Sequence, residues 1–286
     1  MQTSRTPTVT LRLFAAGSCV HPEGVVVKGA PMRPCTLPAL VALIAHPEHG
    51  AILFDTGYSD RFHQETASYP NRLYAKLTPV SFSPEESAAT QLAARGVAPE
   101  QVKTVVLSHF HADHVGAVRD FPEARYLYSS ESYAAMRPLT GLGAVRAGFL
   151  RGLLPDDFEA RSSHFEDLPA CDLGATYAPF NRGADLCGDQ SVVAVPLPGH
   201  AEGHHGLMLR TEEGPVFLVA DAVYKTRAFK ENRPPMGIAR LIFSDWKGYL
   251  DTMSRLHAFH QARPDVLILP SHCQEAWEAF EARGKN

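Results

Sequence analysis

Four side chains that can bind metal ions fall within six consecutive residues: His109, His111, Asp113 and His114. Imidazole and carboxylate groups suit zinc and similar first-row ions. A cluster of histidines can also be no more than a solvated loop. The spacing H-x-H-x-D-H directly after an apolar run is far more restrictive than composition alone, so the segment predicts a metal-binding site.

The elements around this motif aim its side chains in two directions. A strand-forming run over 102–107 ends just before it, and histidines at alternate positions of extended chain, such as His109 and His111, point the same way. Asp113 and His114 stand where a helix through 115–118 is expected to begin, so they face another direction. Two neighbouring ions could therefore share this one segment.

The rest of the chain alternates between strand and helix patterns, which favours a layered α/β arrangement. Residues 58–82 keep no period and predict a long loop with short helical turns. Further strands are expected at 9–15, 40–45, 51–54, 124–128, 191–195, 206–210, 215–220 and 265–269. Helices are expected at 83–95, 115–119, after Ser130, at 245–263 and at 274–282.

Residues 137–185 interrupt this alternation. Apolar residues between Leu142 and Leu154 would share one face of a helix, and a mixed loop follows. We interpret 137–185 as an insertion that covers the active site, although a surface helix packed on the core fits the pattern equally well. With 286 residues, 45% of them hydrophobic, the chain can bury its core as one domain spanning 1–286.

Composition argues against several classes of partner. A net charge of −4 shows no excess of positive charge that would bind nucleic acid. No stretch of the sequence approaches the ~20 consecutive apolar residues that a membrane-spanning helix needs. The N-terminal residues lack the apolar region of a secretion signal. Five cysteines without a C-x-x-C pair indicate neither a disulfide framework nor a thiolate zinc site. A reducing, cytoplasmic location is expected.

The 105–116 motif resembles that of the metallo-β-lactamase-fold hydrolases, in which two β-sheets flanked by helices form an αββα sandwich. Later residues match the family in order and over most of the chain. They are His200 in Pro198-Gly199-His200, Asp221 after the strand ending at Ala220, and His272 in Pro270-Ser271-His272. The resemblance implies that His109, His111 and His200 hold one ion, that Asp113, His114 and His272 hold a second, and that Asp221 bridges them.

Two divalent ions imply a hydrolytic chemistry, with zinc as the default and iron or manganese as alternatives. Cations ~3.5–4 Å apart can share a water, lower its pKa toward ~7 and supply hydroxide as the nucleophile. No G-x-S-x-G elbow offers a covalent nucleophile, and Cys273 has no base at a recognisable spacing. Asp55, in a D-T-G triplet like the family's, is expected to orient a ligand histidine, with a simple turn aspartate as the alternative.

The other histidines are not expected to bind metal. His204 more simply shapes the turn after His200. The remaining ones that lie in loops or on a helix face are expected to be solvated: His21, His46, His49, His63, His164, His257 and His260. His164 could instead reach the substrate from the 137–185 segment.

Tyr224, three residues after Asp221, resembles a tyrosine of the acyl-homoserine lactonase branch of the family. The resemblance implies that its hydroxyl polarises the substrate carbonyl and that Asp113 protonates the leaving alkoxide. Ala201-Glu202 departs from the Thr-Pro that those lactonases tend to have. We therefore predict a dinuclear metal-dependent hydrolase of a small-molecule lactone or carboxylic ester. A homodimer is compatible with the sequence.

Two other functions remain open for this chain. The same metal ligands can serve a phosphodiesterase or a thioesterase, because the set of ligands does not determine whether an acyl or a phosphoryl centre is attacked. A regulatory or binding protein with weak residual activity is the second alternative. The intact ligand set argues against it, because binding alone does not need seven placed metal-binding groups.

Overall fold

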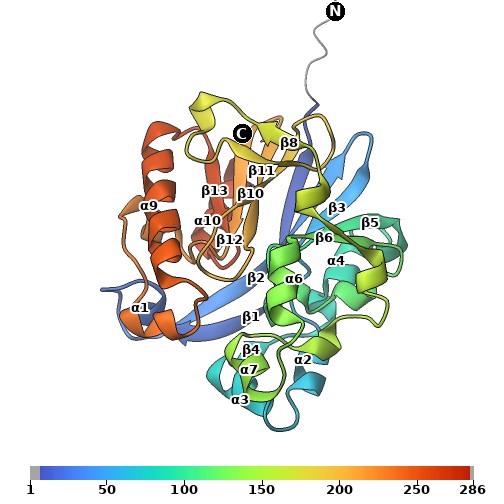
Figure 1. Cartoon of the computed structure of the whole chain (residues 1–286), viewed down its shortest axis with the longest axis vertical. Coiled ribbons are helices and arrows are strands. Elements are labelled where there is room, and N and C mark those ends of the chain that lie inside the picture. Colours follow the sequence, from blue (N-terminus) through green and yellow to red (C-terminus); the bar gives the residue numbers. More distant parts are fainter. Residues whose placement is uncertain (1–6, 284–286) are drawn as a thin grey trace, which may run out of the picture.

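Two β-sheets form the centre of the molecule (Figure 1). The computed structural model describes residues 7–283, so the first six residues of the N-terminal segment considered above lie outside it. The seven-stranded sheet has the order β4 (Val80–Ser81), β1 (Thr10–Pro22), β2 (Pro34–His46), β3 (Gly50–Phe54), β5 (Val102–Val106), β6 (Arg125–Tyr128) and β7 (Ser162–His164). The six-stranded sheet has the order β13 (Leu267–Pro270), β12 (Gly214–Ala220), β11 (His205–Thr211), β10 (Val192–Pro196), β9 (Arg182–Asp185) and β8 (Ala170–Asp172).

Hydrophobic side chains at alternate strand positions fill the space between the sheets. Leu11 and Leu13 of β1 share one buried cluster with Val216 and Leu218 of β12. The residues between them point the other way, and Phe217 joins a second cluster beneath the helices. Strands buried on both faces read as continuous apolar runs, which is how β12 appears in the sequence.

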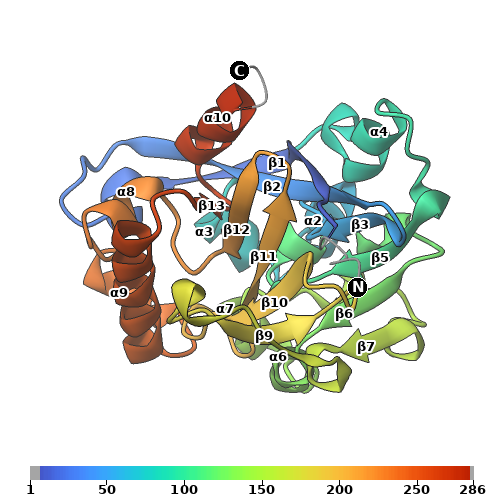
Figure 2. The same ribbon diagram turned by 90° about the horizontal axis from the view of Figure 1, so that it is seen from above.

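Helices cover the outer faces of both sheets. Met253, Leu256 and Phe259 of α9 pack on the six-stranded sheet, and α4 lies on the far side of the molecule against the other sheet (Figure 2). The α-helices are α1 (Glu23–Val26), α2 (Asp60–Glu65), α3 (Arg72–Leu77), α4 (Ala88–Ala93), α5 (Ala112–Val115), α6 (Ser130–Met136), α7 (Gly141–Arg146), α8 (Thr226–Lys230), α9 (Trp246–Ala262) and α10 (Gln274–Arg283). The 3₁₀ turns are η1 (Pro84–Glu86), η2 (Pro99–Gln101), η3 (Val118–Asp120), η4 (Arg151–Leu153), η5 (Glu159–Arg161), η6 (Phe165–Asp167), η7 (Ala175–Tyr177) and η8 (Gly237–Leu241).

This arrangement confirms the predicted αββα sandwich, and two predicted helices need correction. The helix expected over 83–95 is split, because Ser87 takes an extended conformation and its Oγ accepts the Thr90 N–H at 3.1 Å. A second N-cap therefore starts α4 after the 3₁₀ turn η1. The helix expected over 115–119 forms earlier, as α5, and already ends at Val115.

The 137–185 segment is more divided than one helix and a loop. The prediction of one long helix in this segment is wrong, because α7 ends at Arg146 and Gly148 follows with a φ of +62°. Further along, β7 pairs in parallel with β6 and widens the seven-stranded sheet. Strands β8 and β9 continue the six-stranded sheet from β10. Much of the segment thus builds the edges of both sheets.

Two further features bear on the expectations for compartment and membrane. All five cysteines are free thiols. Among residues 7–283, no helix has the length and apolar character needed to span a bilayer.

His46 corrects the expectation of a solvated side chain, because it is 3% exposed. Its Nδ1 accepts the backbone N–H groups of Glu48 and His49, at 3.0 and 3.1 Å. The proton of the neutral ring therefore sits on Nε2, which lies 2.9 Å from the Asp189 carboxylate and 3.0 Å from the Ser191 hydroxyl. The ring fastens the β2–β3 hairpin to the turn before β10.

Replacing His46 by alanine should lower the free energy of unfolding by about 2 kcal/mol, because several polar groups lose their partner at once. Denaturant unfolding measures the change. His49→Ala is the matched control, since His49 is exposed on the same turn, and it should stay within about 0.5 kcal/mol of the parent. Equal destabilisation by the two substitutions would contradict the proposed role of His46.

Candidate active site

The ends of five strands deliver the predicted site residues to one place, and one of these strands is β10, which ends at Pro196 shortly before His200. β3 and β5 are parallel neighbours, so Asp55 and the histidine motif both follow strand ends at the same edge of their sheet. β12 and β13 are parallel neighbours in the other sheet, and Asp221 and His272 follow their ends. Carboxyl ends of parallel strands meet at one edge, which is why segments distant in sequence converge here.

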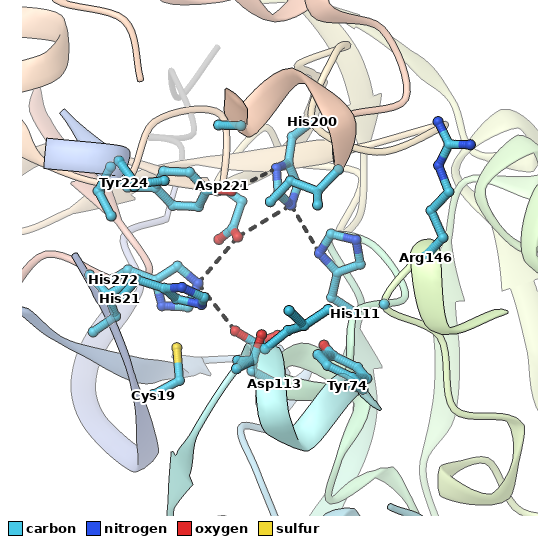
Figure 3. A pocket seen from close by; sticks show the side chains of 18 of the residues that line it. Cys19, His21, Tyr74, His111, Asp113, Arg146, His200, Asp221, Tyr224 and His272 are labelled. Carbon is cyan, nitrogen blue, oxygen red and sulfur yellow. Dashed lines mark hydrogen bonds and ion pairs between the residues drawn. The ribbon is translucent and has the colours of Figure 1, made fainter. Parts of the chain in front are cut away.

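The structure brings all seven predicted metal-binding side chains together in two groups. Figure 3 labels His111, Asp113, His200, Asp221 and His272 from these groups. Within each group, the atoms able to bind a metal lie within 4.8 Å of one another. One group contains His109, His111, His200 and Asp221, and the other contains Asp113, His114 and His272.

Asp221 lies between the two groups. Its Oδ2 is 3.3 Å from His200 Nε2 on one side and 3.2 Å from His272 Nε2 on the other. His272 Nε2 is also 3.2 Å from the Asp113 carboxylate, and His200 Nε2 is 3.0 Å from His111 Nδ1. One carboxylate therefore touches residues of both groups.

Three buried atoms of these groups form no hydrogen bond within residues 7–283: His109 Nε2, His114 Nε2 and Asp221 Oδ1. The last two lie 3.3 Å apart as an ion pair, so of the three His109 Nε2 alone has neither kind of partner. An unpaired buried polar atom costs roughly 1–3 kcal/mol. Burial and the neighbouring imidazoles also lower the pKa of His109 well below its usual value, which leaves a neutral ring with a free lone pair. These residues fit a bound divalent cation.

The carboxylates and two of the histidines stabilise each other's charges. Burial alone would lower the pKa of His114 and of His272, but nearby aspartates outweigh it and raise both pKa values well above normal. Burial would likewise raise the pKa of Asp113 and of Asp221, yet the adjacent imidazoles lower both. A cation at this position would supply the same compensating positive charge.

Asp55 contacts a motif histidine, as expected for an orienting residue. His114 Nδ1 donates to Asp55 Oδ2 at 2.7 Å, so its Nε2 faces the site. The same carboxylate accepts the backbone N–H and the hydroxyl of Ser108, both at 2.9 Å. His272 is held in the same way, through Nδ1 and the carbonyl of Pro38 at 2.7 Å. Such contacts set the tautomer and orientation of metal-binding imidazoles.

His204 shapes the turn after His200, as predicted. Its Nδ1 donates to the Leu197 carbonyl at 3.0 Å, and its Nε2 accepts the Asp221 N–H at 3.2 Å. Burial lowers the pKa of His204 to about 3, so the ring is neutral and can accept that bond. His204 thereby positions the backbone of Asp221.

A cavity of about 640 Å³ opens beside these residues, a volume suited to a small-molecule ligand. Tyr224 lines it with its hydroxyl 3.3 Å from His200 Nδ1. Gly148, beyond α7, packs on the ring of His111, where a Cβ atom would lie 2.7 Å from the ring. Further lining residues come from the strands, α1, α3, α7 and η8: Cys19, His21, Val25, Val26, Leu37, Leu73, Tyr74, Leu77, Leu142, Val145, Arg146, Leu241 and Ile242.

Several other histidines do not lie where the sequence placed them. His21 is half-buried and lines the cavity, so its predicted solvation is wrong. His164 packs on Tyr128 with ring centroids 5.1 Å apart and lies outside the cavity lining, so a substrate contact is wrong as well. His257 and His260 are half-buried against Phe229 rather than solvated. The alternation of Cys19 and His21 along β1 was the available signal for His21.

Comparison with known proteins agrees with this geometry. The model of the metallo-β-lactamase superfamily matches residues 36–272. The chain belongs to the metallo-β-lactamase superfamily. The predictions of this family, of its fold and of a metal-dependent hydrolase are thereby confirmed.

Individual relatives within the superfamily are lactonases. The chain is 28% identical to the N-acyl homoserine lactonase AttM of Azorhizobium caulinodans, over 86% of this chain and 85% of that protein. It is 27% identical to the N-acyl homoserine lactonase AiiB of Agrobacterium fabrum, over 80% and 77%. A solved N-acyl homoserine lactone hydrolase, with N-hexanoyl-L-homoserine at its catalytic metal centre, shares the fold with a TM-score of 0.70 and 21% identity over 96% of this chain and 97% of that one.

Proposed function

We propose that the protein hydrolyses a lactone or a related carboxylic ester. The observation that carries this proposal is the position of Tyr224, whose hydroxyl lies 3.3 Å from His200 and lines the cavity beside the metal-binding groups. A hydroxyl there can donate a hydrogen bond to an ester carbonyl. The lactonase relatives support the same reaction class.

We also infer that two divalent ions occupy the two groups of ligands, with zinc as the default and iron or manganese as alternatives. His109, His111 and His200 would hold one, Asp113, His114 and His272 the other, and Asp221 would contact both. When bound, such ions activate water and withdraw electrons from the ester carbonyl.

Tyr224 and Asp113 would then divide the remaining work. Burial and the Asp221 charge raise the pKa of Tyr224 well above its usual value, so it stays a hydrogen-bond donor while the carbonyl oxygen gains negative charge. Asp113 is a carboxylate, so it would first accept the proton released by the attacking water. As the acyl–oxygen bond breaks, it would return that proton to the leaving alkoxide, and a lactone becomes a hydroxy acid.

The surroundings of the site fit a small-molecule substrate. Leu142, Val145 and Arg146 of the 137–185 segment form part of the cavity wall, which supports a covering role for 141–148. We propose that the chain acts as a single domain, as a monomer or a homodimer. Its five free thiols fit a reducing compartment such as the cytoplasm.

A turnover panel of lactones, thioesters and phosphodiesters tests the reaction class. The metal-loaded protein should hydrolyse lactones with the highest kcat/KM. A preference for phosphodiesters or thioesters would replace the lactone proposal with that chemistry. Absence of turnover on all three would favour a binding or regulatory protein.

Metal analysis after full reconstitution should find close to two transition-metal ions per chain, because the seven residues supply two incomplete shells around a shared carboxylate. Chelation should abolish turnover. A reproducible stoichiometry of one, or activity that survives chelation, would contradict the dinuclear mechanism.

Asp113→Asn keeps the size of the side chain while removing its charge and its capacity to carry a proton. Turnover should fall by ~100-fold or more. Metal content must be measured on the same sample, because Asp113 is also a proposed ligand. An unchanged rate with both ions bound would exclude both roles.

Tyr224→Phe removes only the hydroxyl. Loss of one donor to a developing oxyanion typically costs ~10²–10³ in rate, and kcat on a good lactone should fall accordingly. Both ions and the melting temperature should be retained. If the variant turns over like the parent, Tyr224 serves only to pack against its neighbours, such as Phe243.

A further inference from the structure

His21 occupies a rigid position in the cavity wall. It lies on β1, opposite Cys35 of β2, and two residues after Cys19, which also lines the cavity. Side chains two apart on a strand face the same side of the sheet. Figure 3 shows His21 at the side of the pocket where His272 lies, away from Arg146. A paired strand holds this imidazole close to the metal-binding groups.

Several apolar side chains line the cavity together with His21. Val25, Val26, Leu37 and Ala239 line the same cavity and are apolar. Among residues 7–283, the imidazole of His21 has no hydrogen-bond partner, in contrast to the rings of His46, His204 and His272. The charged or titratable groups that act on it are those of Asp113 and His272.

A half-buried imidazole without a protein partner constrains what can fill the cavity. Burial lowers the pKa of His21, so at neutral pH one ring nitrogen donates a hydrogen bond and the other accepts one. Water can satisfy both while the cavity is open. A purely apolar ligand that displaced this water would leave the ring unsatisfied, so the wall favours a ligand that replaces the lost hydrogen bond.

The position of His21 indicates where that ligand group binds. Figure 3 shows His21 on the same side of the pocket as His272, whose Nε2 lies 3.2 Å from the Asp113 carboxylate. Toward solvent the cavity is bordered by Leu241 and Ile242, which are 58% and 53% exposed. The cavity that His21 lines therefore joins the candidate metal-binding groups to an apolar mouth.

We propose that His21 is a specificity-determining residue, which hydrogen-bonds a hydroxyl, carbonyl or amide of the substrate within a few atoms of the scissile ester. This inference rests on the proposed ester hydrolase function. His21 would make the protein prefer esters that carry such a polar substituent over equally large esters whose substituents are purely hydrocarbon.

Calorimetric binding of two γ-lactams to the full-length, metal-loaded protein tests the inference without requiring turnover. One lactam carries a hexanoylamino group beside the ring carbonyl, and the other carries an alkyl chain of equal length there. The parent protein should bind the amide lactam about tenfold or more tightly than its hydrocarbon partner. His21→Leu should remove that preference, and His21→Gln, which keeps a donor and an acceptor, should restore part of it.

Val25→Ala is the matched control, because it alters the same wall without removing a hydrogen-bonding group. It should weaken both lactams equally and leave their ratio unchanged. Metal content is measured for every variant, which separates a change in the wall from a loss of ions. A ratio that is the same in the parent and in His21→Leu would overturn the inference, as would a parent protein with no preference or no binding.

The turnover panel separates this result from the proposed function. Hydrolysis of lactones together with an unchanged binding ratio would reject the role of His21 alone. A His21-dependent binding ratio without hydrolysis of any lactone would reject the proposed reaction while retaining the assigned recognition group.

Discussion

Two buried carboxylates, Asp113 and Asp221, impose the constraint on which the site depends. A charge removed from water is very costly unless oppositely charged or hydrogen-bonding groups surround it. Here the compensating groups are imidazoles from three distant parts of the chain, at 3.2–3.3 Å from the Asp221 oxygens. The site can therefore exist only where the ends of β5, β10, β12 and β13 meet.

The sandwich satisfies this constraint by placing parallel strand pairs in both sheets. β3 and β5 end together in one sheet, and β12 and β13 end together in the other. The core between the sheets locks their relative position, because interiors are close-packed and resist sliding. Residues such as Asp55 and His204 then fix individual tautomers and backbone positions by single hydrogen bonds. Rigid strands thus form the floor of the site, while short helices and turns form its walls.

Elements with a clear apolar pattern were predictable, and the shortest ones were not. α9 buries one apolar face and β12 is a continuous apolar run, so local sequence already determines their type. β7 and β8 have three residues each, too few for a period to be recognised. They become strands only because β6 and β9 offer free edges beside them. The split at Ser87 depended on one side-chain hydrogen bond that competed with helix continuation.

The candidate ligands of residues 109–114 could be proposed from the sequence, because ligand type and spacing after a strand are local properties. The resemblance to the family added His200, Asp221 and His272. Burial of His46 and exposure of His21 to the cavity could not be predicted, since both depend on partners far along the chain. His46 is held by Asp189, 143 residues away, and the cavity that His21 lines is also bordered by Ala239 of η8. Hydrogen bonding and burial are set by neighbours in space. The sequence alone therefore indicated the candidate metal ligands at the centre of this site, whereas the tertiary structure decided the walls around it.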